Sequence, residues 1–272
     1  MSRLGPIDAA GIEAFARTIR LEALRLIAAA GSGHPGPALS IADVIAVLYQ
    51  SVLRTDPRNP RSPSRDRFIL SKGHGCAALY AALLSRGFFD RAEASAFRTH
   101  GGILQGHPRR SIPGVDATTG PLGLGASIAA GMALARQRQG FRVYALLGDG
   151  ELQAGLVWEA AQFAAHRMLT NLTYVVDRNG LQFTGATEAI VALEPVTAKW
   201  RSFGWDVSCV DGHDVCELHD AFGRAEGRRP HVVIAKTIKG KGVSFMECAV
   251  EWHGRAPSPE ELQRAEAELG VR

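Results

Sequence analysis

One unit of the chain constrains its fold more than any other: two apolar segments, joined by a helical one, that each lead into a polar motif. The apolar run Val143 to Leu147 leads into Gly148-Asp149-Gly150-Glu151, and Leu172 to Val176 leads into Asn179. The residues between them, Leu152 to Met168, have helical spacing. This pattern predicts a β-α-β crossover with two parallel strands, whose carboxyl ends bring Asp149 and Asn179 to one edge of a sheet.

The residue types at this edge suit a metal-bound diphosphate. A carboxylate at Asp149, an amide oxygen at Asn179 and the main-chain carbonyl of Leu181 are hard oxygen ligands, which favour Mg²⁺ or Ca²⁺ over zinc. The helix that follows Gly150 would present its N-terminal amides to an anion. The alternative for the glycine motif alone is an ordinary strand-turn-helix corner with an N-capping aspartate, and Asn179 after the next strand argues against it.

The rest of the chain alternates helices with strands, which predicts a doubly wound α/β fold with a mainly parallel sheet and helices on both faces. Further helices are expected over residues 12–30, 41–51, 77–86, 124–135, 195–203 and 214–227, with a last one opening at Ser258 in a capping box. Further strands are expected over residues 68–70, 205–210 and 231–235. Residues 54–66 predict an exposed loop and residues 100–122 a long functional loop. The length of 272 residues suits one domain over residues 1–272.

Composition narrows the class of protein. The net charge of +4 is mild and the basic residues are dispersed, so nucleic acid is not an expected partner. No apolar stretch reaches membrane-spanning length and no leader precedes the first helix, so no membrane partner is expected. The four cysteines form no CxxC pair, which favours reduced thiols in the cytoplasm.

Six motifs in order along the chain resemble those of thiamine diphosphate enzymes, and more narrowly the N-terminal part of transketolase. The match to the family is specific, because the motifs span residues 32 to 254 in the family's order. The motifs are Ser32-Gly33-His34-Pro35-Gly36, Ser71-Lys72-Gly73-His74-Gly75, Gly106-His107-Pro108, Thr119-Gly120-Pro121-Leu122-Gly123, Lys236-Thr237-Ile238-Lys239-Gly240-Lys241-Gly242 and Trp252-His253-Gly254, in addition to the motif at Asp149.

The resemblance implies roles for individual residues. Histidines at the substrate channel would move protons, work that suits a group titrating near neutrality; these are His34, His74, His107 and His253. Thiamine diphosphate would be bound by His74, Gly120, Pro121, Leu122, Gly148, Asp149, Gly150, Glu151, Asn179, Lys239 and His253. The ligands of Mg²⁺ or Ca²⁺ would be Asp149, Asn179 and Leu181. For Lys239 the alternative is a solvated lysine in a basic turn.

The other five histidines are expected to be structural or exposed. They are His100, His166, His213, His219 and His231. His213 is tempting as a metal ligand, but Asp211-Gly212-His213-Asp214 also makes a good turn and helix N-cap.

The chain resembles only the first domain of a transketolase, which implies half of an active site. The missing domains would supply the glutamate that activates the aminopyrimidine and the pocket around that ring. The implied function is transfer of a two-carbon ketol unit from a ketose (phosphate) donor to an aldose (phosphate) acceptor. A C-terminal partner subunit would be required, in a dimer of heterodimers. A catalytically silent, regulatory homologue and one half of a deoxyxylulose phosphate synthase-like enzyme are the alternatives.

Two features depart from the family or stay open. Many transketolases have a glutamate where this chain has Ala154, in a carboxylate network that links paired sites; Glu159 is similar to its second member. The change is either neutral drift or a weakening of communication between sites, in which case cofactor should bind both sites independently. Arg109 and Arg110 would meet a substrate phosphate or sulfonate, or form an exposed doublet.

Overall fold

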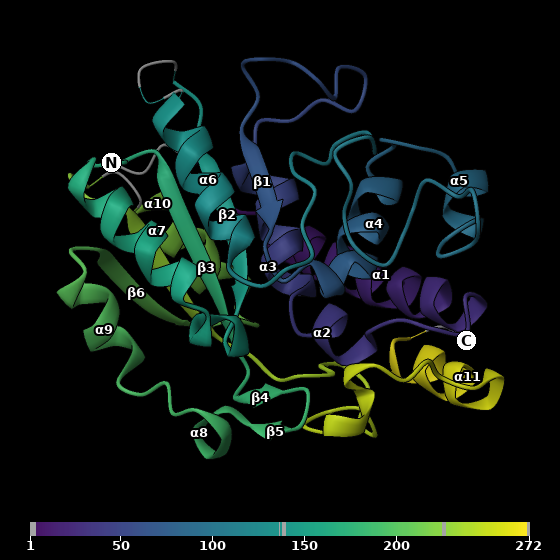
Figure 1. The fold of residues 1–272 in the computed structure, drawn as a ribbon. Helices are drawn as coiled ribbons and strands as arrows, with labels where there is room; N and C mark the ends of the chain where they lie inside the picture. The colour runs from purple at the N-terminus through teal and green to yellow at the C-terminus, as the bar shows by residue number, and fades with distance from the viewer. Residues whose placement is uncertain (1–3, 136, 138–139, 225–226, 271–272) are drawn as a thin grey trace.

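The computed structural model describes residues 4–135, 137, 140–224 and 227–270, and its centre is a five-stranded parallel sheet (Figure 1). The strand order is β1-β2-β3-β7-β6. Their bounds are β1 Arg67–Leu70, β2 Val143–Gly148, β3 Leu172–Arg178, β6 Asp206–Asp211 and β7 His231–Lys236. A separate antiparallel pair, β4 (Leu181–Gln182) and β5 (Gly185–Ala186), follows β3.

The central strands are apolar on both faces because helices cover both faces of the sheet. Alternate side chains of β2 join different clusters of the core: Tyr144 and Leu146 pack on one side, and Val143 and Leu147 on the other. The first side is covered by α1 (Ala9–Ala29), α3 (Ala42–Val47), α4 (Cys76–Ser85) and α10 (Val215–Gly223). The second is covered by α6 (Leu124–Ala135), α7 (Gly155–His166) and α9 (Val196–Ser202).

Short helices occupy the loops around these layers. They are α2 (Pro35–Leu39), α5 (Arg91–Ser95), α8 (Thr187–Ile190), a π-helical turn η1 (Leu48–Val52) and the 3-10 turns η2 (Gly73–Gly75), η3 (Gly150–Gln153) and η4 (Val250–His253). Several of them lie at the carboxyl edge of the sheet, where the sequence motifs are.

The C-terminal segment is held against α1 and α2 by a small third core. Trp252, Met246 and Ala265 pack there with Leu24 and Leu39. The helix α11 (Pro259–Glu268) begins at Ser258, which forms the expected capping box with Glu261. This packing fixes the turn that carries His253 beside α2.

The doubly wound α/β fold and its β-α-β unit are confirmed, and the errors lie at boundaries and in loops. The helix expected over 41–51 ends as the π-helical turn η1, and the one expected over 152–168 begins as the 3-10 turn η3. Sequence periodicity missed α2, α5, α8, η4 and the β4–β5 pair, which are too short to show a repeat. The helix expected over 214–227 ends at Gly223, and residues 225–226 lie outside the described residues.

The loop at 54–66 is exposed along most of its length, as expected, but its end is not. Asp66 is fully buried, where it accepts hydrogen bonds from the side chain and amide of Arg54 and from the amide of Arg142. Within the described residues, every helix is too short or too polar to cross a lipid bilayer.

We expect His231 to make the stability of the fold depend on pH. Its ring is buried at the start of β7, where Nε2 meets Ser208 Oγ at 3.0 Å, and burial lowers the pKa of His231 to about 4. The unfolded chain therefore binds a proton that the folded chain does not, and stability falls as pH drops below 6.5. His231→Gln should remove about 2 kcal/mol of the loss between pH 7 and pH 5.

Urea denaturation at the two pH values measures this. Exposed His166 provides the control, since His166→Gln should keep the pH dependence of the wild type. A His231→Gln variant with an unchanged pH dependence would contradict the assignment.

Candidate functional site

The carboxyl ends of β2 and β3 meet as the sequence predicts. These strands pair in parallel, with Gly148 opposite Asp177. Beyond their ends the amide of Gly180 donates to Asp149 Oδ2 at 2.6 Å, so the segment that carries Asn179 is bonded directly to Asp149.

A cavity of about 380 Å³ lies at this edge and collects most of the predicted site residues. Of those residues it is lined by His34, His74, Gly120, Leu122, Gly148, Asp149, Gly150, Glu151, Asn179, Leu181, Lys239 and His253. Pro37, Lys72, Gln153, Gln182 and Phe183 complete its wall.

The three predicted metal ligands border this one cavity, so the donor set fits a hard divalent cation. Asp149 Oδ1 accepts from Gly150 N at 2.8 Å, and Asn179 Oδ1 accepts from Leu181 N at 3.0 Å. Each oxygen has a further lone pair for a cation. Burial and the charge of Asp177 raise the pKa of Asp149, so a cation beside it would stabilise the carboxylate.

Lys239 gives the cavity its excess positive charge. Its side chain is only 1% exposed, and among the described residues it has no carboxylate partner. Its Nζ donates to the carbonyl of Leu181 at 3.3 Å and to His253 Nδ1 at 2.8 Å. Burial and the neighbouring Lys72 lower the pKa of Lys239 to about 8. A buried ammonium without a counter-charge favours an anionic ligand.

Three histidine rings surround the mouth of this cavity. The ring centroids of His34, His74 and His253 lie 5.2 to 5.7 Å from one another. Burial, with the positive charges of the site, lowers the pKa of His34 to about 4 and that of His253 to about 3, and that of His74 falls in the same direction. All three rings are therefore neutral at pH 7 and can accept a proton or a hydrogen bond.

A buried carboxylate, Asp177, organises the floor of the site. It is fully buried and pairs with Lys72, which is 2% exposed. Ser40 Oγ donates to it at 2.8 Å and Asn179 Nδ2 at 3.0 Å, and the hydroxyl of Thr237 donates as well. Burial alone would raise the pKa of Asp177, but the charge and hydrogen bond of Lys72 outweigh it and hold that pKa below its usual range.

Glu151 connects three loops around the cavity. Its Oε1 accepts from Gly123 N at 2.7 Å and from the hydroxyl of Ser71, and its Oε2 accepts from Gly148 N at 3.0 Å. Glu151 borders the cavity, but its oxygens are bonded to the loops that shape it. Cofactor contact by Glu151 stays a prediction.

The segment that carries Lys239 is positioned by His213, which sequence reasoning placed only in a turn. Its Nε2 accepts from the amide of Ile238 at 2.8 Å, so the ring proton resides on Nδ1, which meets Asp43 Oδ2 at 2.6 Å. Burial raises the pKa of Asp43, but hydrogen bonds from His213 and Arg20 outweigh it and lower that pKa. The N-cap of α10 is Asp214, as expected.

Gly240 closes the same segment. Its φ of 82° and its approach to Met246, whose carbonyl oxygen would lie 2.1 Å from a Cβ at this position, require glycine. The amide of Gly240 donates to the carbonyl of Gly36 at 3.2 Å, which joins the lysine segment to α2.

Arg178, which the sequence did not single out, links the site to α8. Its Nη1 lies 3.3 Å from Asp149 Oδ2 and donates to Thr187 Oγ1 at 2.9 Å, while Nη2 donates to Glu188 at 2.9 Å and Glu194 at 3.1 Å. This guanidinium partly neutralises Asp149 and fixes the loop beyond β5.

Some predicted residues lie beside the cavity and not on its wall. His107 is exposed, and its ring would meet a Cβ on Gly73 at 3.2 Å, next to the cavity wall at Gly120. Pro121 is exposed in the adjoining loop, between Gly120 and Leu122. Arg110 lines a different cavity. Ala154 is the N-cap of α7, and Glu159 is exposed on that helix.

Sequence comparison matches residues 12–272 to the model of the transketolase thiamine diphosphate binding domain. The chain belongs to the transketolase family. It is 44% identical over 261 residues to the 6-deoxy-6-sulfo-D-fructose transketolase subunit SqwG of Clostridium sp. (strain MSTE9), covering 93% of this chain and 94% of the relative. It is 37% identical over 257 residues to an apulose-4-phosphate transketolase subunit of Phocaeicola vulgatus, covering 93% and 92%.

A solved structure agrees with this assignment. The fold superposes on transketolase from Campylobacter jejuni with a TM-score of 0.92 and 32% sequence identity, covering 97% of this chain. The chain spans 43% of that transketolase but nearly the whole of the two subunit relatives. The family resemblance and the thiamine diphosphate-binding fold expected from the sequence are therefore confirmed.

We expect the Lys72–Asp177 pair to be the most sensitive polar contact of the fold. Asp177→Asn leaves the ammonium of Lys72 buried without its counter-charge, which should lower the free energy of unfolding by about 3–5 kcal/mol. Urea denaturation measures the loss. The control is Asp56→Asn, which breaks an exposed pair with Arg58 and should leave the urea midpoint unchanged. Equal midpoints for both variants would contradict the central role of Asp177.

Proposed function

We propose that this chain is the N-terminal subunit of a split transketolase. It would act with a C-terminal partner to transfer a two-carbon ketol unit from a ketose donor to an aldose acceptor. The observation that carries the proposal is the buried ammonium of Lys239, without a carboxylate partner among the described residues, in a cavity bordered by hard oxygen donors. Such a site selects a dianion together with a divalent cation.

We assign the binding of thiamine diphosphate to this cavity. Asp149, Asn179 and the carbonyl of Leu181 would hold Mg²⁺ or Ca²⁺, and Lys239, His74, His253 and the amide of Gly150 the diphosphate. The loop of Gly120, Pro121 and Leu122 would contact the rings. When bound, the cofactor supplies the electron sink for breaking and forming the carbon–carbon bond.

The histidines would handle the substrate protons. A neutral imidazole at His34 or His74 accepts a proton from a donor hydroxyl as the donor is cleaved, and returns it to the acceptor oxygen when the new bond forms. Their low pKa values, caused first by burial, keep them in the accepting form at pH 7. His107, beside Gly120, would extend this group toward the substrate.

The partner subunit would cover an exposed apolar face beside the cavity. Leu122 and Leu124, before and at the start of α6, and Leu156 and Phe163 on α7 are all exposed. Leu122 also lines the cavity, so this face is continuous with the site. A partner seated there would exclude water and add the aminopyrimidine pocket with its activating glutamate. A dimer of two such heterodimers is the assembly we propose.

The substrate class follows from the relatives. One is named for a sulfonated ketose and another for a sugar phosphate, apulose-4-phosphate. We propose a sugar phosphate or sulfonated sugar for this chain. We also propose that residues 1–272 form one domain and that the protein works in the cytoplasm, where its four free cysteines would remain reduced.

The test is ketol transfer by the mixture of this chain with the C-terminal subunit that co-purifies with it. Neither chain alone should form product from a ketose and an aldose, and the mixture should do so only with thiamine diphosphate and Mg²⁺ present. Asp149→Asn, which removes the charge at the metal position, should lower the rate of the mixture at least about 100-fold.

Two results would contradict this proposal. Transfer by the isolated chain would remove the need for a partner. A mixture that binds the cofactor but transfers nothing, with any of the sugar classes above, would favour the catalytically silent homologue. A product that requires pyruvate would favour the deoxyxylulose phosphate synthase-like alternative.

A further inference from the structure

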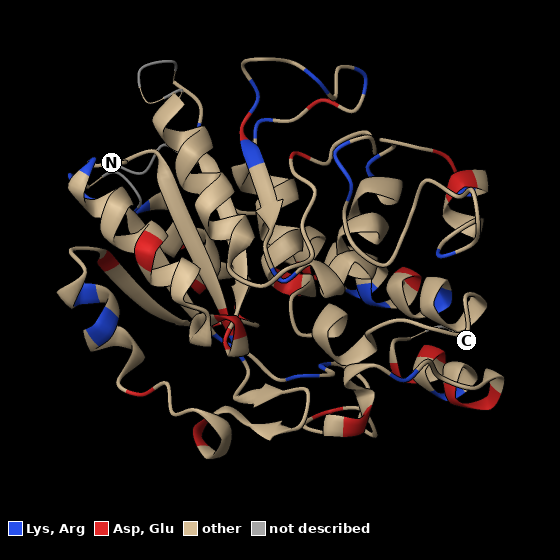
Figure 2. Ribbon diagram, viewed as in Figure 1, with Lys and Arg blue, Asp and Glu red and all other residues tan. Residues whose placement is uncertain are grey.

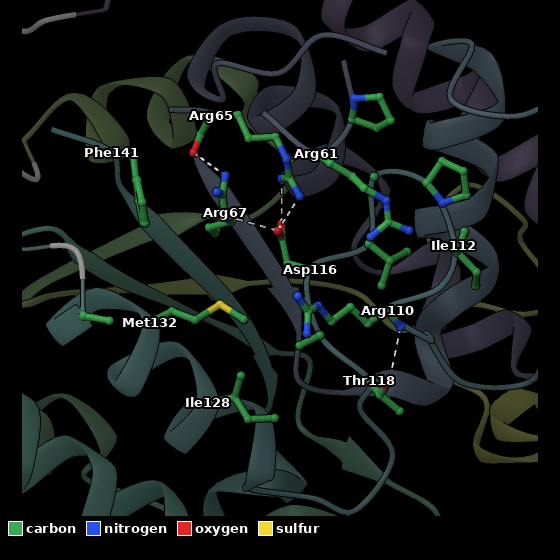
Figure 3. Close-up of a pocket in the computed structure, with 16 residues that line it drawn as sticks. Arg61, Arg65, Arg67, Arg110, Ile112, Asp116, Thr118, Ile128, Met132 and Phe141 are labelled. Carbon is green, nitrogen blue, oxygen red and sulfur yellow. Dashed lines mark hydrogen bonds and ion pairs between the residues drawn. The ribbon is translucent and has the colours of Figure 1, made fainter. Parts of the chain in front are cut away.

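A second cavity, of about 640 Å³, lies at the amino ends of β1 and β2, at the opposite edge of the sheet from the cofactor site (Figure 3). We call it the arginine cavity, after Arg61, Arg65, Arg67 and Arg110 in its wall. Asp116 is the only acidic residue that lines it, so the four arginines leave a net charge of +3 (4 − 1). Figure 2 shows basic residues recurring along the loop that precedes β1.

The inner half of the arginine cavity is rigid because Asp116 fixes it. This carboxylate is buried and accepts from the amide of Phe68 at 2.9 Å and from Arg65 Nη1 at 3.0 Å, and Arg67 Nε lies 3.5 Å away. The side chain of Arg65 is 9% exposed, and its Nε is buried with no hydrogen-bond partner in the described part of the chain. Asp116 therefore orients the inner arginines without neutralising both of them.

The outer half carries two cations that the fold does not use. Arg61 and Arg110 are exposed, and neither guanidinium has an ion pair or hydrogen bond with another described residue. In Figure 3 both side chains extend into the space in front of Asp116. Guanidinium forks bind phosphate oxygens through paired, charge-assisted hydrogen bonds, and several forks around one cavity suit a dianion.

The opposite wall of the arginine cavity is apolar. Ile128 and Met132 of α6 line it together with Phe141, whose ring centroid lies 4.8 Å from the guanidinium carbon of Arg67. A ligand that satisfied only the arginines would leave this wall exposed to water. The volume also exceeds what a free phosphate ion would fill, and it lies in the range of small-molecule sites.

We propose that the arginine cavity is a binding site for a small organic phosphate. The phosphate monoester would meet Arg61 and Arg110 with the spare donor of Arg65, and an apolar or aromatic body would pack on Met132 and Phe141. The site is separate from the cofactor cavity, since the two share no lining residue.

The methyl group of Met132 provides a direct probe, because the chain has only four methionines. In the full chain labelled with ¹³C at the methionine methyl groups, phenyl phosphate should shift the Met132 signal in NMR spectra, with a Kd below about 1 mM. Inorganic phosphate should bind at least about tenfold more weakly, and phenol should give no saturable shift. The signals of Met168, exposed beyond α7, and Met246, buried in the third core, should not move.

Variants separate this site from other sources of phosphate binding. The double variant Arg61→Gln/Arg110→Gln should weaken phenyl phosphate at least about tenfold. Arg109→Gln, which removes a neighbouring exposed arginine outside the cavity wall, and Lys239→Gln, in the cofactor cavity, should leave the Kd unchanged. An unshifted Met246 signal in each variant verifies the fold, and the single variant Arg110→Gln replaces the double one if that signal moves.

Three results would overturn the proposal. A Met132 shift that disappears with Lys239→Gln would place the phosphate in the cofactor cavity. Equal weakening by Arg109→Gln would mean general attraction to a basic surface. Absence of a saturable Met132 shift with phenyl phosphate would mean that the arginine cavity binds no organic phosphate.

Discussion

One buried carboxylate, Asp177, holds together the segments on which the candidate site depends. It bonds Lys72 after β1, Ser40 after α2, Thr237 after β7 and Asn179 after its own strand. A buried charge is tolerated only when it is paired and hydrogen-bonded, so each of these segments has one favourable position. The metal donors and the lysine segment inherit their placement from this contact. Removing it would disturb the whole carboxyl edge, whereas His213 and Glu151 each fix only one part of it.

The arrangement also explains why the site is cationic and open. Lys72 is neutralised by Asp177, while Lys239 beside it is not, and the two positive charges together keep the nearby histidines neutral. This balance suits a ligand that carries its own negative charge, as a diphosphate does. The exposed leucines next to the cavity extend its apolar edge outward, toward a surface that a partner subunit would complete.

Much of this could be predicted from the sequence because long periodic segments and ordered motifs carry strong signals. The parallel strands at Val143 and Leu172, the capping box at Ser258 and the joint placement of Asp149, Asn179 and Leu181 around one cavity all agree with prediction. Short elements such as α2 and α8 could not be predicted, because their packing and not their periodicity creates them. The Lys72–Asp177 pair and the His213 contact join residues far apart in the chain. A lone aspartate at the end of the apolar strand β3 was the available signal for the first, and nothing local indicates the second.

The most direct test of the account is isothermal titration of thiamine diphosphate, with Mg²⁺, into this chain alone and into its mixture with the C-terminal subunit. If the cavity is half of a site, binding should be weak or absent alone and at least about 100-fold tighter in the mixture. Lys239→Gln should weaken that binding, while Lys241→Gln, in the same turn but half exposed, should not. Equal affinity with and without the partner, or no binding even in the mixture, would contradict the account.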